Sequence, residues 1–301
     1  MSIPGARIEL VQTRGLRFEV AIAGGSGTGD KLALLLHGFP ECAYSWRHQV
    51  PVLAQLGYRV WVPNLRGYGK SDRPLSVSDY ALDKLEQDVA DLIEASGARS
   101  VTLIAHDWGA AIAWSYAMYN PGKLERLVIM NVPHPVLMQK GLRTLKQLRK
   151  SWYMGFFQIR GLPEKLMSLG DFAAIGRAFR DSAVHKERFT DADLEVFKKN
   201  AAEPGALSAM INYYRALPSS LALGKKRGAP KIETKTLLIW GEQDIALGKE
   251  LTYGTDQLVS DLTVRYIADA SHWVQQDRPD AVNAMLNAFL SDQAVPEASV
   301  L

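Results

Sequence analysis

Residues 100–119 read SVTLIAHDWGAAIAWSYAMY, and the change of pattern inside this stretch decides the fold. The stretch opens with a short apolar run that is typical of a buried strand, and from Gly109 onward it is rich in helix-forming residues. Asp107 lies between the two halves. A sharp strand-to-helix turn folds the chain back on itself, so it needs small residues two positions either side. Ala105 and Gly109 occupy those positions.

This pattern is that of a nucleophile elbow, G-x-S-x-G, with a carboxylate in place of the serine. An elbow presents its central side chain at the carboxyl edge of the sheet and at the N-terminus of the next helix. The free N–H groups and partial positive charge of that helix end favour an ionised Asp107. The alternative is that Asp107 only caps the helix, so the elbow interpretation depends on partner groups elsewhere in the chain.

The composition excludes several classes of partner. Of 301 residues, 47% are hydrophobic and 22% charged, as in ordinary globular proteins. The net charge of +3, from 35 basic and 32 acidic residues, is too balanced to indicate nucleic acid or an anionic membrane surface. A single cysteine, Cys42, excludes an internal disulfide. With no visible signal peptide and no apolar run of membrane-span length, we expect a cytoplasmic protein without a membrane span.

Short β-prone runs alternate with helical patterns along most of the chain, which predicts a mostly parallel sheet with helices on both faces. The expected strands are 7–13, 16–23, 32–38, 58–65, 101–105, 124–132, 235–242 and 262–268, and the expected helices are 43–56, 79–96, 109–119 and 279–291. The first two strands form a hairpin with Gly15 in its turn.

The alternation stops after Pro133, and only helical patterns occur up to about Gly228. We therefore predict a core made of residues 1–133 and 229–301, interrupted by a helical lid at 134–228. Because the insertion leaves from the carboxyl end of a strand, where open α/β sheets bind ligands, we expect it to cover Asp107.

The start of the lid carries a row of basic residues spaced three apart. The row consists of Lys140, Arg143, Lys146 and Arg149, and it lies opposite Leu142, Leu145 and Leu148. We interpret the basic row as the solvated face of a lid helix and not as a binding site for a specific anionic partner.

The candidate triad partners of Asp107 lie just after the last two expected strands of the chain. His272 lies in the loop ASHW before the last helix, and Asp244 ends GEQD just past strand 235–241. The order nucleophile, acid, histidine is that of the elbow-type hydrolytic triad. Asp244 would hold the tautomer of His272 and stabilise its imidazolium form. Separately, Asp244 could be a turn residue and His272 a packed loop histidine, but their joint order at strand ends favours the triad.

The loop HGFP at 37–40 follows a buried strand, and its Phe39 backbone N–H can form an oxyanion hole with that of Trp108. His37 and His106 are expected mainly to bind loop backbone, while the Phe39 and Trp108 side chains can equally serve as pocket walls.

A carboxylate nucleophile restricts the reaction. Serine attacking a saturated carbon would leave an ether, which water cannot reopen. Asp107 would leave an ester, whose carbonyl a His272-activated water can attack. The elbow therefore indicates displacement at an sp³ carbon, with an epoxide oxygen or a halide as leaving group.

The tyrosines of the lid favour the epoxide. Tyr153, Tyr213 and Tyr214 are the lid tyrosines, and a phenol with a pKa of about 10 is protonated at neutral pH and can donate to an epoxide oxygen. Without the aspartate elbow, these side chains would be interpreted as lid-packing aromatics.

Seven motifs together resemble the epoxide hydrolases of the α/β-hydrolase superfamily, over residues of about 30 to 290. They are HGFP (37–40), RGYGKSDRP (66–74), HDWG (106–109), SWYMGFFQ (151–158), NYYR (212–215), GEQD (241–244) and ASHW (270–273). The resemblance implies the α/β-hydrolase fold, with an eight-stranded, mostly parallel sheet and an inserted helical cap. It also implies a cis bond at Phe39–Pro40.

For the site, the resemblance implies Asp107 as nucleophile, Asp244 and His272 as the charge pair, and Tyr153 and Tyr214 as proton donors. Tyr214 is preferred to Tyr213 because the family's tyrosine directly precedes an arginine, here Arg215. The pocket walls are expected to include His37, Phe39, Pro40, Trp108, Trp152 and Phe157. The expected reaction converts a small apolar epoxide and water to a vicinal diol through an ester on Asp107, without a metal or organic cofactor.

Two alternatives remain. A haloalkane or haloacid dehalogenase uses the same triad, but haloalkane dehalogenases commonly have a second halide donor where Phe39 stands. Fluoroacetate dehalogenases have arginines where this chain has Trp108, Ala110 and Ala111. The other alternative is a non-catalytic binding protein with the hydrolase fold. The chain is expected to be a monomer or homodimer that binds no nucleic acid and has no membrane span.

Overall fold

A single sheet organises the computed structural model, which describes residues 2–25 and 31–300. Its strands follow the order β1-β2-β4-β3-β5-β6-β7-β8. Strand β2 is antiparallel to β1 and β4, and all the other neighbours are parallel. The strands are β1 (Arg7–Gln12), β2 (Arg17–Ala23), β3 (Lys31–Leu36), β4 (Arg59–Pro63), β5 (Ser100–His106), β6 (Leu124–Met130), β7 (Lys235–Gly241) and β8 (Leu262–Ile267). The predicted hairpin and mostly parallel sheet are confirmed.

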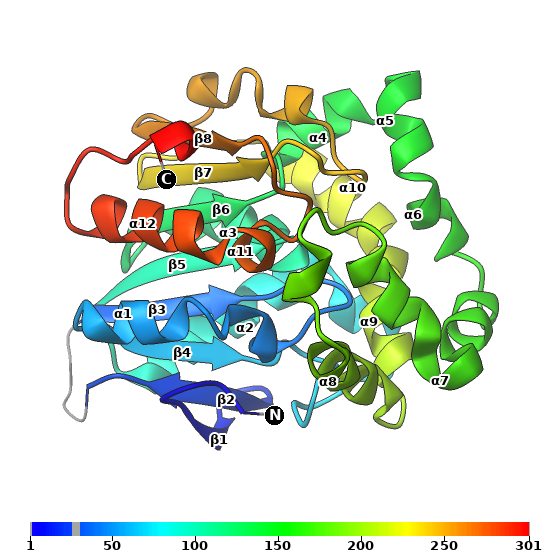
Figure 1. The fold of residues 1–301 in the computed structure, drawn as a ribbon. Coiled ribbons are helices and arrows are strands. Elements are labelled where there is room, and N and C mark those ends of the chain that lie inside the picture. The colour runs from blue at the N-terminus through cyan, green and yellow to red at the C-terminus, as the bar shows by residue number, and fades with distance from the viewer. Residues whose placement is uncertain (1, 26–30, 301) are drawn as a thin grey trace.

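Helices cover both faces of the sheet (Figure 1). On one face lie α1 (Val50–Gln55), α11 (Val274–Asp277) and α12 (Pro279–Leu290), and on the other lie α2 (Leu82–Ser96) and α3 (Trp108–Tyr119). Strand β3 has apolar side chains on both faces, so it packs against both helix layers. Its Leu34 packs in the cluster that includes α2 and α3, whereas its Leu35 packs in the cluster of α1 and α12.

Two predicted helices are shorter than expected. The stretch 43–56 divides into a 3₁₀ turn, η1 (Ala43–Trp46), and helix α1, which has a proline in its first turn. The stretch 79–96 begins with a second 3₁₀ turn, η2 (Val77–Tyr80), before α2. Helix α2 ends where predicted, at Gly97, whose φ of 67° is the left-handed conformation that favours glycine.

A run of helices separates β6 from β7 and lies beside the carboxyl ends of the strands (Figure 1). These helices are α4 (Pro135–Gly141), α5 (Leu145–Lys150), α6 (Trp152–Phe156), α7 (Leu162–Arg180), α8 (Asp191–Ala202), α9 (Ala206–Arg215) and α10 (Leu217–Arg227). The residues 131–234 contain no strand. The division into a core and a lid at 134–228 stays a prediction.

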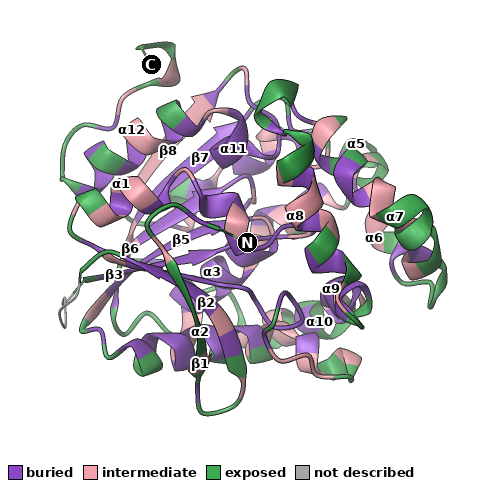
Figure 2. Ribbon diagram, turned by 60° about the horizontal axis from the view of Figure 1, so that its bottom comes forward, coloured by how far each residue is buried: buried purple, intermediate pink, exposed green. Residues whose placement is uncertain are grey.

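Burial follows this architecture. The central strands are buried along most of their length, whereas α5 and α7 carry broad exposed segments (Figure 2). Within the described residues, the structure has no helix that is long and apolar enough to cross a membrane.

Candidate active site

Asp107 stands at the tight turn between β5 and α3. Its φ of 47° and ψ of −124° lie in a sparsely populated region that costs about 1–3 kcal/mol for a residue with a side chain. The turn is possible because two residues packed closely around it, Gly38 and Gly109, have no side chain. A Cβ on Gly109 would lie 2.3 Å from the Leu36 carbonyl oxygen, and one on Gly38 would lie 2.2 Å from the Asp107 Cβ. The carboxylate makes no capping bond to α3, which argues against the alternative of a simple helix cap.

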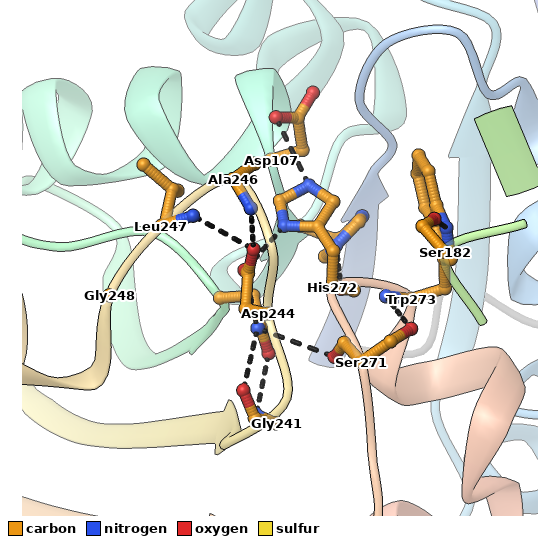
Figure 3. Close-up of polar contacts among 12 residues, drawn as sticks. Asp107, Ser182, Gly241, Asp244, Ala246, Leu247, Gly248, Ser271, His272 and Trp273 are labelled. Atoms are coloured by element: carbon orange, nitrogen blue, oxygen red, sulfur yellow. Dashed lines mark hydrogen bonds and ion pairs between the residues drawn. The ribbon is translucent and has the colours of Figure 1, made fainter. Parts of the chain in front are cut away.

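The three predicted triad residues meet at the carboxyl edge of the sheet (Figure 3). His272 Nε2 lies 3.4 Å from Asp107 Oδ2, and His272 Nδ1 lies 2.7 Å from Asp244 Oδ2. Asp244 follows β7, and His272 lies in the loop between β8 and α11. Because β5, β7 and β8 are parallel, their carboxyl ends bring residues that are far apart in the sequence to one edge.

Backbone groups and an asparagine hold Asp244 in place. Its Oδ1 accepts hydrogen bonds from the N–H groups of Ala246, at 2.7 Å, and Leu247, at 2.8 Å. Its Oδ2 accepts one from Asn131 Nδ2, at 2.8 Å. Asn131 also accepts the Gly241 N–H through its side-chain oxygen, at 2.9 Å, and thereby ties the end of β6 to the end of β7.

Asn131 is not among the predicted site residues. Its φ of 50° is left-handed, a conformation that asparagine tolerates better than most residues. A polar asparagine near the end of the otherwise apolar expected strand 124–132 was the available signal.

The charges of the triad support one another. Burial alone would raise the pKa of Asp107, but the hydrogen bond and charge of His272 outweigh burial and hold this pKa below its usual value. The pKa of Asp244 is lowered in the same way, against burial and mainly by the charge of His272. Burial would lower the pKa of His272, but the charge of Asp244 and the hydrogen bond with Asp107 raise it well above its ordinary value. The resting site thus holds an imidazolium between two carboxylates.

A second buried network supports the histidine loop. His106 Nε2 lies 2.7 Å from the His272 carbonyl oxygen, and its Nδ1 lies 2.7 Å from Glu41 Oε2. Glu41 also accepts the Gly38 N–H at 2.8 Å and the side-chain amides of Gln275 and Gln276. The expectation that His106 binds loop backbone is confirmed, whereas Glu41 was missed. Its position one residue after HGFP was the only signal.

The predicted oxyanion loop reaches the nucleophile. The Phe39 N–H donates to Asp107 Oδ1 at 2.6 Å, and the Phe39–Pro40 bond is cis, as the resemblance implied. Trp108 is the first residue of α3, and the N–H groups of a first helical turn have no partner within the helix. The two backbone donors named from the sequence therefore lie in the HGFP loop and directly after the nucleophile.

A cavity of about 610 Å³ lies above Asp107 and His272. Its predicted wall residues Phe39, Pro40, Trp152 and Phe157 all line it, as do Phe156, Met167 and Trp273. The prediction that His37 and Trp108 line this cavity is wrong. His37 is fully buried, with Nδ1 against the Gly38 carbonyl at 2.9 Å and Nε2 accepting the Leu65 N–H at 3.1 Å. The Trp108 side chain lies against Tyr213 and Tyr214, outside the cavity lining.

Two of the three lid tyrosines line the cavity. Tyr153 on α6 and Tyr214 on α9 are both wall residues, with ring centroids 5.8 Å apart. Burial raises the pKa of both phenols, and the charge of Asp107 raises it further. Tyr213 differs, because its hydroxyl donates to the Arg66 carbonyl at 2.9 Å and it is not a wall residue. Tyr153 and Tyr214, and not Tyr213, therefore line the same cavity as Asp107.

The chain is similar to known proteins over most of its length. Residues 33–279 match the family described as alpha/beta hydrolase fold. Epoxide hydrolase 4 of Mus musculus is 39% identical over 289 residues, which cover 94% of this chain and 79% of that protein. Epoxide hydrolase 2 of Caenorhabditis elegans is 37% identical over 290 residues, which cover 95% and 80%.

A solved structure is also similar. It is a variant of an epoxide hydrolase from Bacillus megaterium, crystallised with its diol product. The sequence identity is 30% and the TM-score is 0.86, and the match covers 94% of this chain and 100% of that chain. Together with the matched family, these relatives establish that the chain belongs to the epoxide hydrolases of the α/β-hydrolase superfamily.

Proposed function

We propose that this protein hydrolyses small apolar epoxides to vicinal diols through a covalent ester on Asp107. The observation that carries the proposal is one cavity that contains an elbow carboxylate, a histidine beside it and two buried phenols. Asp107, His272, Tyr153 and Tyr214 all line it. A carboxylate nucleophile with acid donors fits an epoxide, whose oxygen must gain a proton as the ring opens.

In the first step, Asp107 attacks one ring carbon and the bond from that carbon to the epoxide oxygen breaks. Oδ1 is held by the Phe39 N–H at 2.6 Å, so we assign Oδ2 as the attacking atom and Oδ1 as the future ester carbonyl oxygen. The opened oxygen takes a proton from Tyr153 or Tyr214. Their raised pKa keeps the protons in place until negative charge develops on the substrate.

Ester formation prepares the second step. Asp107 loses its negative charge when it is alkylated, so one of the two groups that raise the pKa of His272 disappears. The imidazolium then returns its proton to the tyrosinate and becomes a base. Neutral His272 takes a proton from water, and the hydroxide attacks the ester carbonyl.

The Phe39 and Trp108 N–H groups stabilise the resulting oxyanion. When the intermediate collapses, the bond from the carbonyl carbon to Oδ2 breaks and Oδ2 leaves with the diol. The two protons of the water restore the diol hydroxyl and the imidazolium, and Asp107 is again a carboxylate.

The walls of the cavity argue against a halide as leaving group. A halide needs N–H donors around it, but the side chain at position 39 is the apolar Phe39, and the Trp108 side chain is hydrogen-bonded to Tyr214. The two phenols line the cavity instead, and phenols can protonate an oxygen leaving group.

The pH dependence should differ between the two steps. Because the pKa of Asp107 is lowered, ester formation should stay constant as the pH falls from 7 toward about 4. Ester breakdown requires neutral His272, so its rate should fall as the pH decreases through the pKa of that imidazole. Quenched single-turnover mass measurements of the ester at several pH values separate the two rates. A parallel acid loss in both rates would contradict the assignment of His272 to the second step.

An oxygen-18 experiment tests the proposed intermediate. With enzyme in excess over styrene oxide in heavy-oxygen water, one turnover should place the label in the Asp107 carboxylate and leave the diol unlabelled. Peptide and product masses report the two positions. Label in the diol instead would mean direct attack of water on the epoxide.

A substrate panel tests the choice of leaving group. The enzyme should convert aliphatic epoxides to diols and should release no chloride from chloroalkanes. Chloride release would favour the dehalogenase alternative.

A further inference from the structure

The outer edge of the predicted lid, formed by α5, α6 and α7, exposes an unusual number of large apolar side chains. We call this surface the cap edge, residues 140–169. Within the described residues, seven of the fourteen exposed large apolar side chains belong to it. They are Leu145, Leu148, Trp152, Ile159, Leu162, Leu166 and Leu169. The three helices run along one side of the molecule in both views (Figures 1 and 2).

Helix α5 exposes apolar residues and buries a polar one, which is the reverse of an ordinary surface helix. Leu145 and Leu148 are 73% and 54% exposed, whereas Gln147 between them is only 1% exposed. The buried amide donates to Ser151 Oγ at 2.9 Å and to the Ala246 carbonyl at 2.8 Å. The interpretation of this segment as a merely solvated basic face is therefore incomplete, because its leucines are exposed with the basic residues. A helix that satisfies a buried glutamine and exposes leucines is suited to an apolar medium on its outer side.

The same segment concentrates positive charge. Residues 140–165 contain seven basic side chains, Lys140, Arg143, Lys146, Arg149, Lys150, Arg160 and Lys165, against the single acidic Glu164. This gives a local charge of +6, whereas the whole chain has only +3, so the remainder is net negative. Glu164 is itself paired with Arg215 at 2.6 Å, and Lys146 pairs with Glu250 at 2.9 Å. The positive charge of the chain is thus concentrated at the cap edge, although the overall charge is nearly balanced.

The cavity over Asp107 reaches this edge. Trp152 lines the cavity and is 67% exposed, and Ile245, another wall residue, is 64% exposed. Arg149 and Lys150 of α5 are also wall residues. The entrance to the site is therefore bordered by exposed apolar and basic side chains.

We propose that the cap edge docks on the surface of a lipid bilayer that contains anionic headgroups. Leucines and Trp152 would enter the headgroup region, and the basic residues would lie against lipid phosphates, which is the combination that interfacial protein surfaces use. A second copy of this chain fits less well, because two cap edges facing each other would bring like charges together. One consequence rests on the proposed function, namely that lipophilic epoxides would reach the cavity from the bilayer.

Vesicle sedimentation tests the docking without any need for turnover. The protein should pellet with vesicles of phosphatidylcholine mixed with phosphatidylglycerol, remain in solution with phosphatidylcholine alone, and be released at about 1 M salt, where the Debye length is about 3 Å. Lys140→Gln with Arg143→Gln should weaken binding about 30-fold. Leu145→Gln with Leu148→Gln should weaken it at least about tenfold.

Matched controls lie outside the cap edge. Leu75→Gln removes an exposed leucine elsewhere, and Lys31→Gln with Lys231→Gln removes two exposed lysines, one at the first position of β3 and one shortly before β7, at the amino ends of these strands. Both controls should bind vesicles like the wild type, and thermal unfolding should show that every variant is folded. Wild-type protein that stays in solution, or control variants that lose binding as much as the cap-edge variants, would overturn the proposal. A dimer that the leucine substitutions convert to a monomer would do so as well, by assigning the edge to a subunit contact.

Discussion

His272→Gln is expected to stop turnover while one equivalent of substrate remains bound to Asp107 as an ester. Ring opening needs only the Asp107 carboxylate and the two phenols. Without the imidazolium, burial raises the pKa of Asp107 and the Phe39 N–H is left to stabilise the carboxylate, so ester formation should be slower than in the wild type and should speed up as the pH rises. Ester hydrolysis, in contrast, loses its only base. We expect steady-state turnover to fall by at least about 10³-fold.

Intact-mass measurement after mixing with an epoxide gives a direct answer. The variant should gain the mass of one substrate molecule, and peptide mapping should place that mass on Asp107. His185→Gln is a matched control, because His185 lies on the lid beside Glu187 and Asp269 and outside the cavity lining. The control should keep wild-type turnover and show no adduct. A His272 variant that consumes substrate without any adduct would refute the two-step scheme.

Removing both cavity phenols has the second-largest expected effect. Tyr153→Phe and Tyr214→Phe should each slow ester formation by about 10–100-fold, and the double variant should lose about 10³-fold or more. Phenylalanine keeps the ring packing, such as the 4.8 Å contact between the Tyr214 and Phe157 centroids, so the loss reports the hydroxyl protons. The first step is affected because the opened epoxide oxygen would have no acid beside it.

Tyr213→Phe is the matched control for the tyrosine pair. Tyr213 is the direct neighbour of Tyr214, but its hydroxyl donates to the Arg66 carbonyl. Its loss should lower stability by about 1 kcal/mol and leave the rate of ester formation unchanged. Single-turnover quench experiments measure all four rates. Full activity in the double variant, or a loss in Tyr213→Phe as large as in Tyr214→Phe, would show that the proton donors are assigned wrongly.

Much of the site was predictable from the sequence because its chemistry lies at strand ends. The apolar run before Asp107 and the small residues Ala105 and Gly109 indicate the elbow before any packing is known. Parallel strands place their carboxyl ends at one edge, so Asp244 and His272 could be brought to Asp107 from their order alone. Helix and strand periods likewise predicted every strand of the sheet, with small differences at the ends.

The tertiary structure decided whatever depended on the direction of a side chain. Neighbouring residues on a helix point about 100° apart, so only packing shows that Tyr214 enters the cavity and Tyr213 turns to Arg66. Glu41 and Asn131 act through partners 65 and 113 residues away, and no local pattern encodes such contacts. Leu145 and Leu148 have an ordinary helical spacing, but their exposure follows from the burial of Gln147 against a distant loop. Local periodicity thus determined the elements and their order, whereas long-range hydrogen bonds and packing decided which faces of those elements carry the function.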